Sequence, residues 1–467
     1  QFSAKRRGKG EIELKKQKQK IDESKLLFSN HDLKVLLIPL MVEQLLNSLM
    51  GTVDSMMVSN VGSAAISAVS LVDSINVLVI QVFTALTAGG AIICSQYLGR
   101  KDVKACNKAA RQVLLSMLVI SIGLMVVCIA FRHPLLRLIF GNVEQDVMDN
   151  SQIYFLITAL SFPFIGLFDA NAAFFRAEGN SKLPMTISAL CNLANIAGNA
   201  ILIFGFNMGV AGAAISTLVS RILMSIIMIC RQRVPKQEIV IRDYFSIRPD
   251  MKLILIILSV GIPSGIENGM FQFGKLAIQS TVSTLGTTAI AAQAMTIILE
   301  NLNGIAAMGI GIGLMTIVGQ CIGAGEKEQA VYYIKKLAVL SEFVVIVCCL
   351  LIWALTKPIT MIAGMEPASA DMCFYMMTVI TIVKPIIWVP AFIPPYGLRA
   401  AGDVKFSMIL STCSMWIFRV SLCIYLCRVQ GFGPIAVWIG MFTDWTIRGI
   451  VFTFRFMGRR WLAHKVV

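Results

Sequence analysis

The chain has 467 residues, of which 57% are hydrophobic and only 14% are charged, and its mean hydropathy is +0.76. Soluble domains carry roughly a quarter charged residues, so this composition excludes an ordinary soluble protein. The formal net charge of +15 is concentrated in polar breaks between apolar runs. Such breaks indicate membrane topology rather than binding to a nucleic acid.

Apolar runs long enough to cross a bilayer recur along the whole chain, and we expect about twelve transmembrane helices. In chain order the predicted spans are residues 35–58, 66–97, 111–131, 151–174, 184–206, 210–230, 253–284, 289–321, 331–355, 371–396, 405–427 and 433–456. Candidate kinks are Pro39, Pro163, Pro184, Pro263, Pro385 and Pro390. The even-numbered breaks are basic and the odd-numbered ones carry few or no basic residues. The positive-inside rule therefore predicts two cytoplasmic termini.

The same breaks predict how the chain is divided. We expect a basic cytoplasmic tail at 1–34, a first six-helix lobe at 35–230, a cytoplasmic linker at 231–252, a second six-helix lobe at 253–456 and a cytoplasmic tail at 457–467. The first tail contains RRGKG and KKQKQK, which are predicted to contact anionic lipid. The 12 cysteines form no CxxC pair and are interpreted as reduced packing residues.

The sequence repeats itself at a spacing of 224 residues. Positions that match at this spacing are Pro39 and Glu43 with Pro263 and Glu267, Gly62 with Gly286, Gln96 with Gln320, and Gly99 with Gly323. Further along, FRAEGNSK matches LRAAGDVK at a spacing of 223. Since an even number of spans separates equivalent positions, the two lobes are predicted to be parallel repeats. Such repeats place a ligand path at their interface in membrane transporters.

Several fragments along the two halves resemble one known family. They are TVDSMMVSNVGSAAISAVS, AGGAIICSQYLGRKD with GIGLMTIVGQCIGAGEKE, FFRAEGNSKLPM with GLRAAGDVKFSM, and NAILIFGFNMGVAGAAIST. In this order they are similar to the multidrug and toxic compound extrusion (MATE) family, from about residue 30 to 460. The resemblance implies an all-α membrane antiporter with two bundles that form a V-shaped cleft, driven by H+ or Na+.

The resemblance also implies a cation-coupling site in the first lobe. Its residues would be Asp54, Asn195, Asn199 and Thr217, with Asn171 as a weaker match. The residue types support this grouping, because Asn195 and Asn199 share one helical face and a carboxylate, amides and a hydroxyl offer the oxygen ligands that Na+ or another hard cation prefers. Hydrogen bonding between helices is the alternative explanation for the Asn and Thr residues.

Two departures from the family argue against a second cation site. The essential acid of another branch falls here on Phe271, and the acid that this branch carries on its tenth helix has no counterpart in VITIVKPIIWVPAF. The repeat also argues against a cation site in the second lobe, because Asp54 corresponds to Ile278 and Asn195 to Arg419. A separate departure concerns the first-lobe site: close family members often carry Asp where this chain has Asn199, so this site would hold a single strong charge and bind Na+ less strongly.

The spans of the second half instead hold other ionisable residues, which are costly in a membrane unless they are paired. They are Glu267, Lys275, Glu300, Lys384, Arg419 and Asp444. One interpretation is pairing, for example of Lys275 with Glu267 or Glu300. The other is that these groups line the substrate path.

Glu43 and Glu267 are repeat mates, each one turn after a proline near the cytoplasmic end of its span. We hypothesise that they meet across the cleft when its cytoplasmic side closes, and that they then share a proton. Asp73 and Glu300 rank lower as gate residues.

The predicted function is secondary active efflux of amphipathic, cationic drugs or metabolites in exchange for H+ or Na+, by alternating access. The alternative is a flippase for lipid-linked or anionic amphiphilic substrates. An enzyme is not expected, because His31, His133 and His464 lie outside or at the ends of the spans, and no Walker phosphate loop occurs. We expect no cofactor besides the coupling ion, small amphipathic molecules and lipids as partners, no nucleic acid, a monomer, and a bacterial cytoplasmic membrane as location.

Overall fold

The described residues of the computed structural model, 26–141, 144–242, 244 and 247–464, form helices and turns, with no strand among them. The basic stretches predicted to contact lipid lie in residues 1–25, outside this part of the chain. The first lobe comprises α2 (Asn30–Ser59), α3 (Ser63–Gly99), α4 (Val103–Ala130), α5 (Arg132–Phe140), α6 (Gln145–Leu160), α7 (Phe162–Ala177), α8 (Lys182–Asn199) and α9 (Gly209–Gln232). The second lobe comprises α10 (Met251–Val282), α11 (Thr287–Gly323), α12 (Lys327–Ile362), α13 (Pro367–Ala400), α14 (Val404–Ser414), α15 (Ser421–Arg428) and α16 (Ile435–Met457).

Within the described residues, eleven helices are long and apolar enough to cross a membrane, and the bent pair α6–α7 makes a twelfth span. This confirms the predicted number. The pair bends by 43° at Ser161, next to Pro163, as predicted for a proline kink. Pro184 instead lies in the first turn of α8, where proline is tolerated, so the kink predicted there is wrong. Many helices extend past the predicted spans; α12, for example, exceeds the predicted span at both ends.

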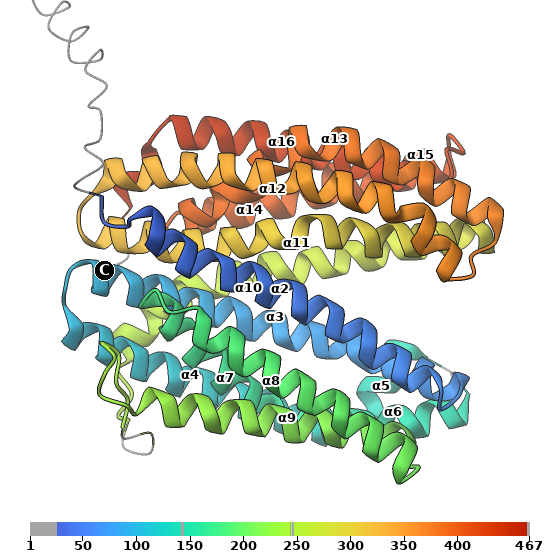
Figure 1. Cartoon of the computed structure of the whole chain (residues 1–467), viewed down its shortest axis with the longest axis horizontal. Helices are drawn as coiled ribbons and strands as arrows, with labels where there is room; N and C mark the ends of the chain where they lie inside the picture. The colour runs from blue at the N-terminus through green and yellow to red at the C-terminus, as the bar shows by residue number, and fades with distance from the viewer. Residues whose placement is uncertain (1–25, 142–143, 243, 245–246, 465–467) are drawn as a thin grey trace, which may run out of the picture.

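The two lobes lie one above the other in Figure 1, the first in blue to green and the second in yellow to red. Helices α2 and α3 of the first lobe pack against α10 and α11 of the second. The closest approaches include Gly89 against Gly261, Gly309 against Met41 and Gly319 against Ser95, all in the halves of these helices that lead to the basic turns. Hydrophobic packing crosses this interface, because the first turns of α2 pack into the core of the second lobe and Leu253 and Ile257 of α10 pack into the core of the first.

Two glycines allow the lobes to touch at one end. A Cβ on Gly323 would lie 2.7 Å from the carbonyl carbon of Gln96, and a Cβ on Gly99 would lie 2.8 Å from that of Gln320. The Gln96 side chain donates to the carbonyl oxygen of Ala400 at 2.8 Å, and the Gln320 side chain donates to that of Ala177 at 2.6 Å. The two glutamines are repeat mates, and so are the two alanines whose carbonyl oxygens accept from them. We call this arrangement the basic-end contact.

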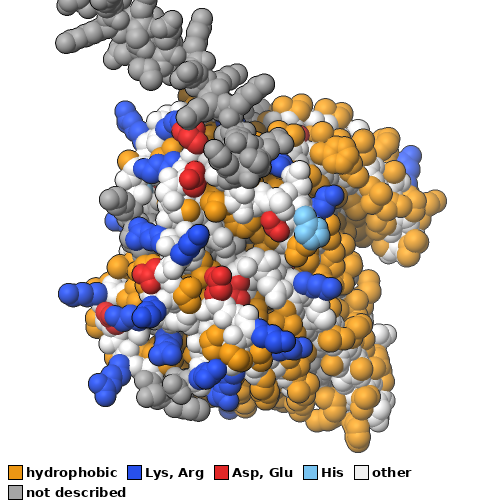
Figure 2. All heavy atoms as spheres, turned by 60° about the vertical axis from the view of Figure 1, so that its left-hand side comes forward, with side chains coloured by type: hydrophobic (Ala, Val, Ile, Leu, Met, Phe, Trp, Pro, Cys, Tyr) orange, Lys and Arg blue, Asp and Glu red, His pale blue; other side chains and the backbone are white. Residues whose placement is uncertain are grey.

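Figure 2 shows this end of the molecule, where Lys and Arg side chains gather around the helix turns, while apolar side chains cover the flank beside it. The exposed basic residues here include Lys101, Lys104, Lys108, Lys327 and Lys405. A basic end and an apolar flank are what the positive-inside pattern and a lipid-facing surface require.

The linker between the lobes packs on the basic end of the first lobe. The amide of Ile239 donates to the Glu178 side chain at 2.6 Å, and the Gln112 side chain bridges the backbone of Arg248 and Asp250. Burial raises the pKa of Glu178 to about 7, although the Ile239 amide opposes this shift. The Lys108 ammonium, 2.6 Å from Asp250, lowers the pKa of that carboxyl.

Candidate cation site and charged cavity

The first lobe brings Asp54 of α2 together with the two asparagines of α8. The Asn199 amide nitrogen donates to Asp54 Oδ1 at 2.8 Å and lies 3.5 Å from Asn195 Oδ1. With its amide turned by 180°, Asn195 donates to Asp54 Oδ1 at 3.0 Å and accepts from the Thr217 amide at 3.1 Å. In the other orientation the Asn195 nitrogen lies 3.4 Å from the Thr217 hydroxyl. Four of the five predicted coupling residues therefore form one cluster.

The donor set of this cluster suits a small cation. Asn195 and Asn199 are buried, and within the described part of the chain the side-chain oxygen of Asn199 has no hydrogen-bond partner. An unpaired buried oxygen is costly, because it loses its contacts with water. A Na+ ion would be coordinated by that oxygen together with the Asp54 carboxylate, whereas a proton would bind to the carboxylate alone.

Asn171 lies apart from this cluster. Its amide nitrogen donates to the carbonyl oxygen of Leu167 at 2.7 Å, and its oxygen accepts from the hydroxyl of Tyr244 in the linker at 3.4 Å. The structure therefore gives Asn171 a role in holding the linker, and no contact with Asp54 is among its described interactions.

Further charges surround the cluster, and the sequence interpretation missed some of them. Asp73 and Arg221 lie near enough to interact electrostatically with Asp54, and Arg221 also interacts with Asp169. Asp73 Oδ1 accepts from the Tyr154 hydroxyl at 3.3 Å. Asp169 also interacts with Arg176, which Glu43 already holds. Four carboxylates thus face two guanidinium groups, so the interior of the first lobe is acidic. Asp169 and Arg221 could have been found by the rule that ionisable residues inside spans are functional candidates.

The hypothesis that Glu43 and Glu267 meet across the cleft is wrong in this structure. Glu43 pairs with Arg176 at 2.6 Å, and Glu267 pairs with Arg399 at 2.6 Å, each within its own lobe. The two arginines belong to the repeated FRAEGNSK and LRAAGDVK segments. Each glutamate is therefore held by an arginine of its own lobe, and no contact between the two glutamates is among their described interactions.

The buried glutamates of the second lobe form ion pairs, but neither of them pairs with Lys275 as predicted. Glu300 forms an ion pair with Lys384 at 2.5 Å, and Lys384 also bonds the Asn303 side chain. With Glu267 and Glu300 both engaged elsewhere, Lys275 lies over the ring of Phe271 at 5.0 Å. The expected pairing of Lys275 with either glutamate is therefore wrong.

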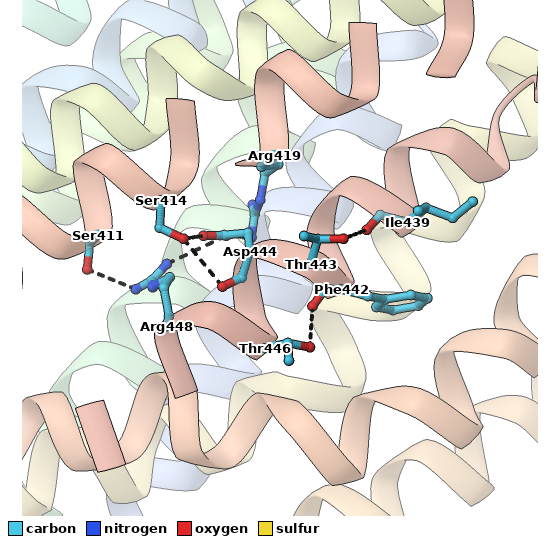
Figure 3. Close-up of polar contacts among 9 residues, drawn as sticks. All are labelled: Ser411, Ser414, Arg419, Ile439, Phe442, Thr443, Asp444, Thr446 and Arg448. Carbon is cyan, nitrogen blue, oxygen red and sulfur yellow. Dashed lines mark hydrogen bonds and ion pairs between the residues drawn. The ribbon is translucent and has the colours of Figure 1, made fainter. Parts of the chain in front are cut away.

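Arg419, the repeat mate of Asn195, belongs to a buried network in the same lobe (Figure 3). Its guanidinium lies 2.7 Å from Asp444, which also accepts from the Ser414 hydroxyl at 2.5 Å. Arg448, one turn further along α16, lies 3.9 Å from the same carboxylate and donates to Ser411 at 3.1 Å. One carboxylate therefore serves two guanidinium groups. Arg448 was not singled out from the sequence, although it lies inside a predicted span.

A duplicated bundle of membrane-spanning helices, with ionisable groups buried beside the interface of its halves, is typical of membrane transporters. The MatE family model matches residues 39–201 and 263–425, so the chain belongs to the MatE family. Each match lies within one of the two predicted lobes, and the two matches are offset by 224 residues, the predicted repeat spacing.

Known proteins of similar sequence span nearly the whole chain. A probable multidrug resistance protein NorM from Thermotoga maritima is 24% identical over 443 residues, covering 92% of this chain and 93% of its own. Multidrug export protein MepA from Staphylococcus saprophyticus is 22% identical over 375 residues, covering 80% and 82%.

Solved structures share the fold. A crystal structure of MATE in complex with MaL6 has a TM-score of 0.86 at 18% identity, and covers 92% of this chain and 95% of that one. An outward-facing conformation of a multidrug resistance MATE family transporter of the MOP superfamily also has a TM-score of 0.86, at 17% identity and the same coverage.

Proposed function

We propose that the protein exports amphipathic compounds across a cell membrane in exchange for a cation, H+ or Na+, that binds at Asp54. The observation that carries this proposal is the cluster of Asp54, Asn195 and Asn199, with its unpaired amide oxygen. It occurs in one lobe only, since the repeat mate of Asp54 is Ile278. Family membership and the export function named for the relatives support efflux as the direction of transport.

Coupling needs only that the cation binds one conformation of the protein more tightly than the other. In this structure the lobes touch at the basic-end contact, which the positive-inside rule assigns to the cytoplasm. The cleft is then closed toward the cytoplasm, and both termini are cytoplasmic. A cation that binds from the outside reduces the repulsion between Asp54 and its neighbour Asp73, and so favours the helix packing of the loaded state.

For the cargo, the resemblance to the MATE family implies amphipathic cations, which the acidic interior of the first lobe suits. A second candidate function is movement of lipid-linked or anionic amphiphiles. The observation that favours it is the surplus of cations in the second lobe, where Arg419 and Arg448 share Asp444. We propose that either function is performed by a monomer in a bacterial cytoplasmic membrane, without a cofactor besides the coupling ion.

The test is efflux of a fluorescent cationic dye from vesicles in which Na+ and H+ gradients are imposed separately. Asp54→Asn is expected to abolish gradient-driven efflux, and the gradient that drives the wild type identifies the ion. Asp371→Asn is the matched control, because Asp371 is an exposed carboxylate at the start of α13, outside the cluster. Unchanged gradient-driven efflux in Asp54→Asn would refute the proposal.

A further inference from the structure

A cavity of about 210 Å³ lies within the second lobe, where it faces the first. Its walls come from α10, α11, α13 and α16, and Gln81 of α3 is the part of its lining that the first lobe supplies. The cavity lies outside the Asp54 cluster, which belongs to α2, α8 and α9 of the other lobe.

The charges that line this cavity do not balance. Glu267 and Arg399 neutralise one another at 2.6 Å, which leaves Lys275 and Arg448 as the remaining charged groups of the lining. The Lys275 side chain is exposed and lies over the ring of Phe271, and it interacts electrostatically with Glu300, a carboxylate that Lys384 already holds at 2.5 Å. No carboxylate of the described residues forms an ion pair with Lys275 itself.

Arg448 is buried, with a side chain that is 4% exposed, yet it is only partly satisfied. Within the described residues, its Nε and Nη1 atoms have no hydrogen-bond acceptor, and the carboxylate that it approaches at 3.9 Å is held by Arg419 at 2.7 Å. A buried guanidinium with free donors is costly unless an anion accepts from it. Figure 3 shows that Arg448 and Arg419 both approach the single carboxylate of Asp444.

We propose that this cavity binds the anionic group of an amphipathic cargo, a carboxylate or sulfonate, between Lys275 and the free donors of Arg448. Guanidinium and ammonium groups bond such oxyanions strongly. A cargo that carries an anionic group, including a zwitterion whose cation the acidic first lobe suits, then gains affinity from the cavity, whereas a purely cationic compound gains nothing from it. This assignment of substrate class rests on the proposed transport function.

The walls and size of the cavity fit one end of such a molecule. Aromatic rings of Phe271, Phe392 and Tyr396 line it, and they offer apolar surface next to the two cations. Its volume is below the ~300–1,000 Å³ of pockets that enclose a whole drug-sized ligand. The cavity therefore receives the anionic head group and an adjoining ring, and the remaining body of the cargo extends into the interface between the lobes.

The position of Gln81 links this site to transport. Because the first lobe supplies one wall, a relative movement of the lobes changes the cavity. The affinity for the anionic group therefore differs between conformations, as alternating access requires.

The experiment compares two probes that differ in one charge: a rhodamine dye with a free carboxylate, and the methyl ester of the same dye. Binding to the purified full-length protein in nanodiscs of neutral lipid is measured by fluorescence anisotropy. Lys275→Gln is expected to weaken binding of the carboxylate dye roughly tenfold and to leave the ester unchanged, because one charged hydrogen bond is lost. Lys275→Arg, which keeps the charge, is expected to restore most of the affinity.

Lys357→Gln is the matched control. Lys357 is an exposed lysine that also lies over a phenylalanine ring, that of Phe374 at 4.6 Å, but outside the cavity. Equal weakening for both dyes in Lys275→Gln, or equal effects of Lys275→Gln and Lys357→Gln, would overturn the proposal. Displacement of the carboxylate dye by phosphatidylglycerol added to the nanodiscs would also overturn it, and would assign the cavity to a lipid head group.

Failure of this inference can be distinguished from failure of the proposed function. If Asp54→Asn abolishes gradient-driven efflux of both dyes while Lys275→Gln binds both normally, coupled transport stands and the anion site does not. If Lys275→Gln loses only the carboxylate dye while Asp54→Asn still couples, the anion site stands and the coupling site does not.

Discussion

Replacing Gly323 with Ala is expected to open the basic-end contact. The added Cβ would lie 2.7 Å from the carbonyl carbon of Gln96, whereas carbon atoms pack at about 3.5–4.0 Å. The neighbour is backbone, so it cannot rotate away as a side chain can. Helices α11 and α3 must therefore separate by about 1 Å or more at this end.

Such a separation also breaks the hydrogen bonds that cross the contact. The bonds from Gln96 to Ala400 and from Gln320 to Ala177 are 2.8 and 2.6 Å long, and neither tolerates an added 1 Å. Each contributes about 0.5–1.5 kcal/mol, so the closed conformation loses about 1–3 kcal/mol. The ratio of closed to open molecules then falls by a factor of roughly 5–150.

The assay is the distance between spin labels on the two lobes at this end. Labels at Lys104→Cys in α4 and Lys327→Cys in α12 occupy exposed sites, in a background where the accessible Cys230, Cys348 and Cys413 are replaced with Ser. Gly323→Ala should move the distance distribution to longer values.

Gly123→Ala in α4 is the control, since a Cβ there meets nothing within 4 Å. An unchanged distribution in folded Gly323→Ala protein would refute the reasoning.

Two further predictions concern charged groups. Glu43→Gln leaves Arg176 without its partner and should cost roughly 3 kcal/mol of stability in thermal unfolding, whereas a second change, Arg176→Gln, should recover most of it; equal losses would contradict this. Burial raises the pKa of Glu178 in the folded protein to about 7, against an ordinary pKa of 4.5. The folded state therefore binds more protons between these values, so stability falls by up to about 3 kcal/mol as pH rises through this window and is level above it. Glu178→Gln should remove this slope from the melting temperature measured against pH, and an equal slope in both proteins would contradict the assignment.

Hydropathy and self-comparison were sufficient to predict the number of spans and their parallel duplication, whereas the two-bundle shape was implied by the family resemblance. Each span must hold about 20 apolar residues whatever its neighbours are, and the 224-residue spacing is a property of the sequence itself. Helix ends were less predictable, because α12 extends into polar surroundings where a hydrophobic run gives no signal. The short helix α5 was not anticipated for the same reason.

The candidate site was predictable only where its members are close in sequence or follow a family pattern. Asn195 and Asn199 are one turn apart, which placed them on one face. Ion-pair partners are a different matter: Glu43 and Arg176 are 133 residues apart, and tertiary packing alone decides which of several arginines is near. The wrong partners assigned to Glu43, Glu267 and Lys275 all have this cause.

The basic-end contact also constrains how this chain can vary. Gly99 meets Gln320 while Gly323 meets Gln96, so each half binds the other through the same surface, as the subunits of a dimer do across an isologous interface. Such a surface must complement its own copy, and a change in one half has to fit the unchanged segment of the other. The interior is under no such requirement, because Asn195 and its mate Arg419 each find their described partners within their own lobe. A gene-duplicated transporter can therefore keep a symmetric closure and still acquire two chemically distinct interiors.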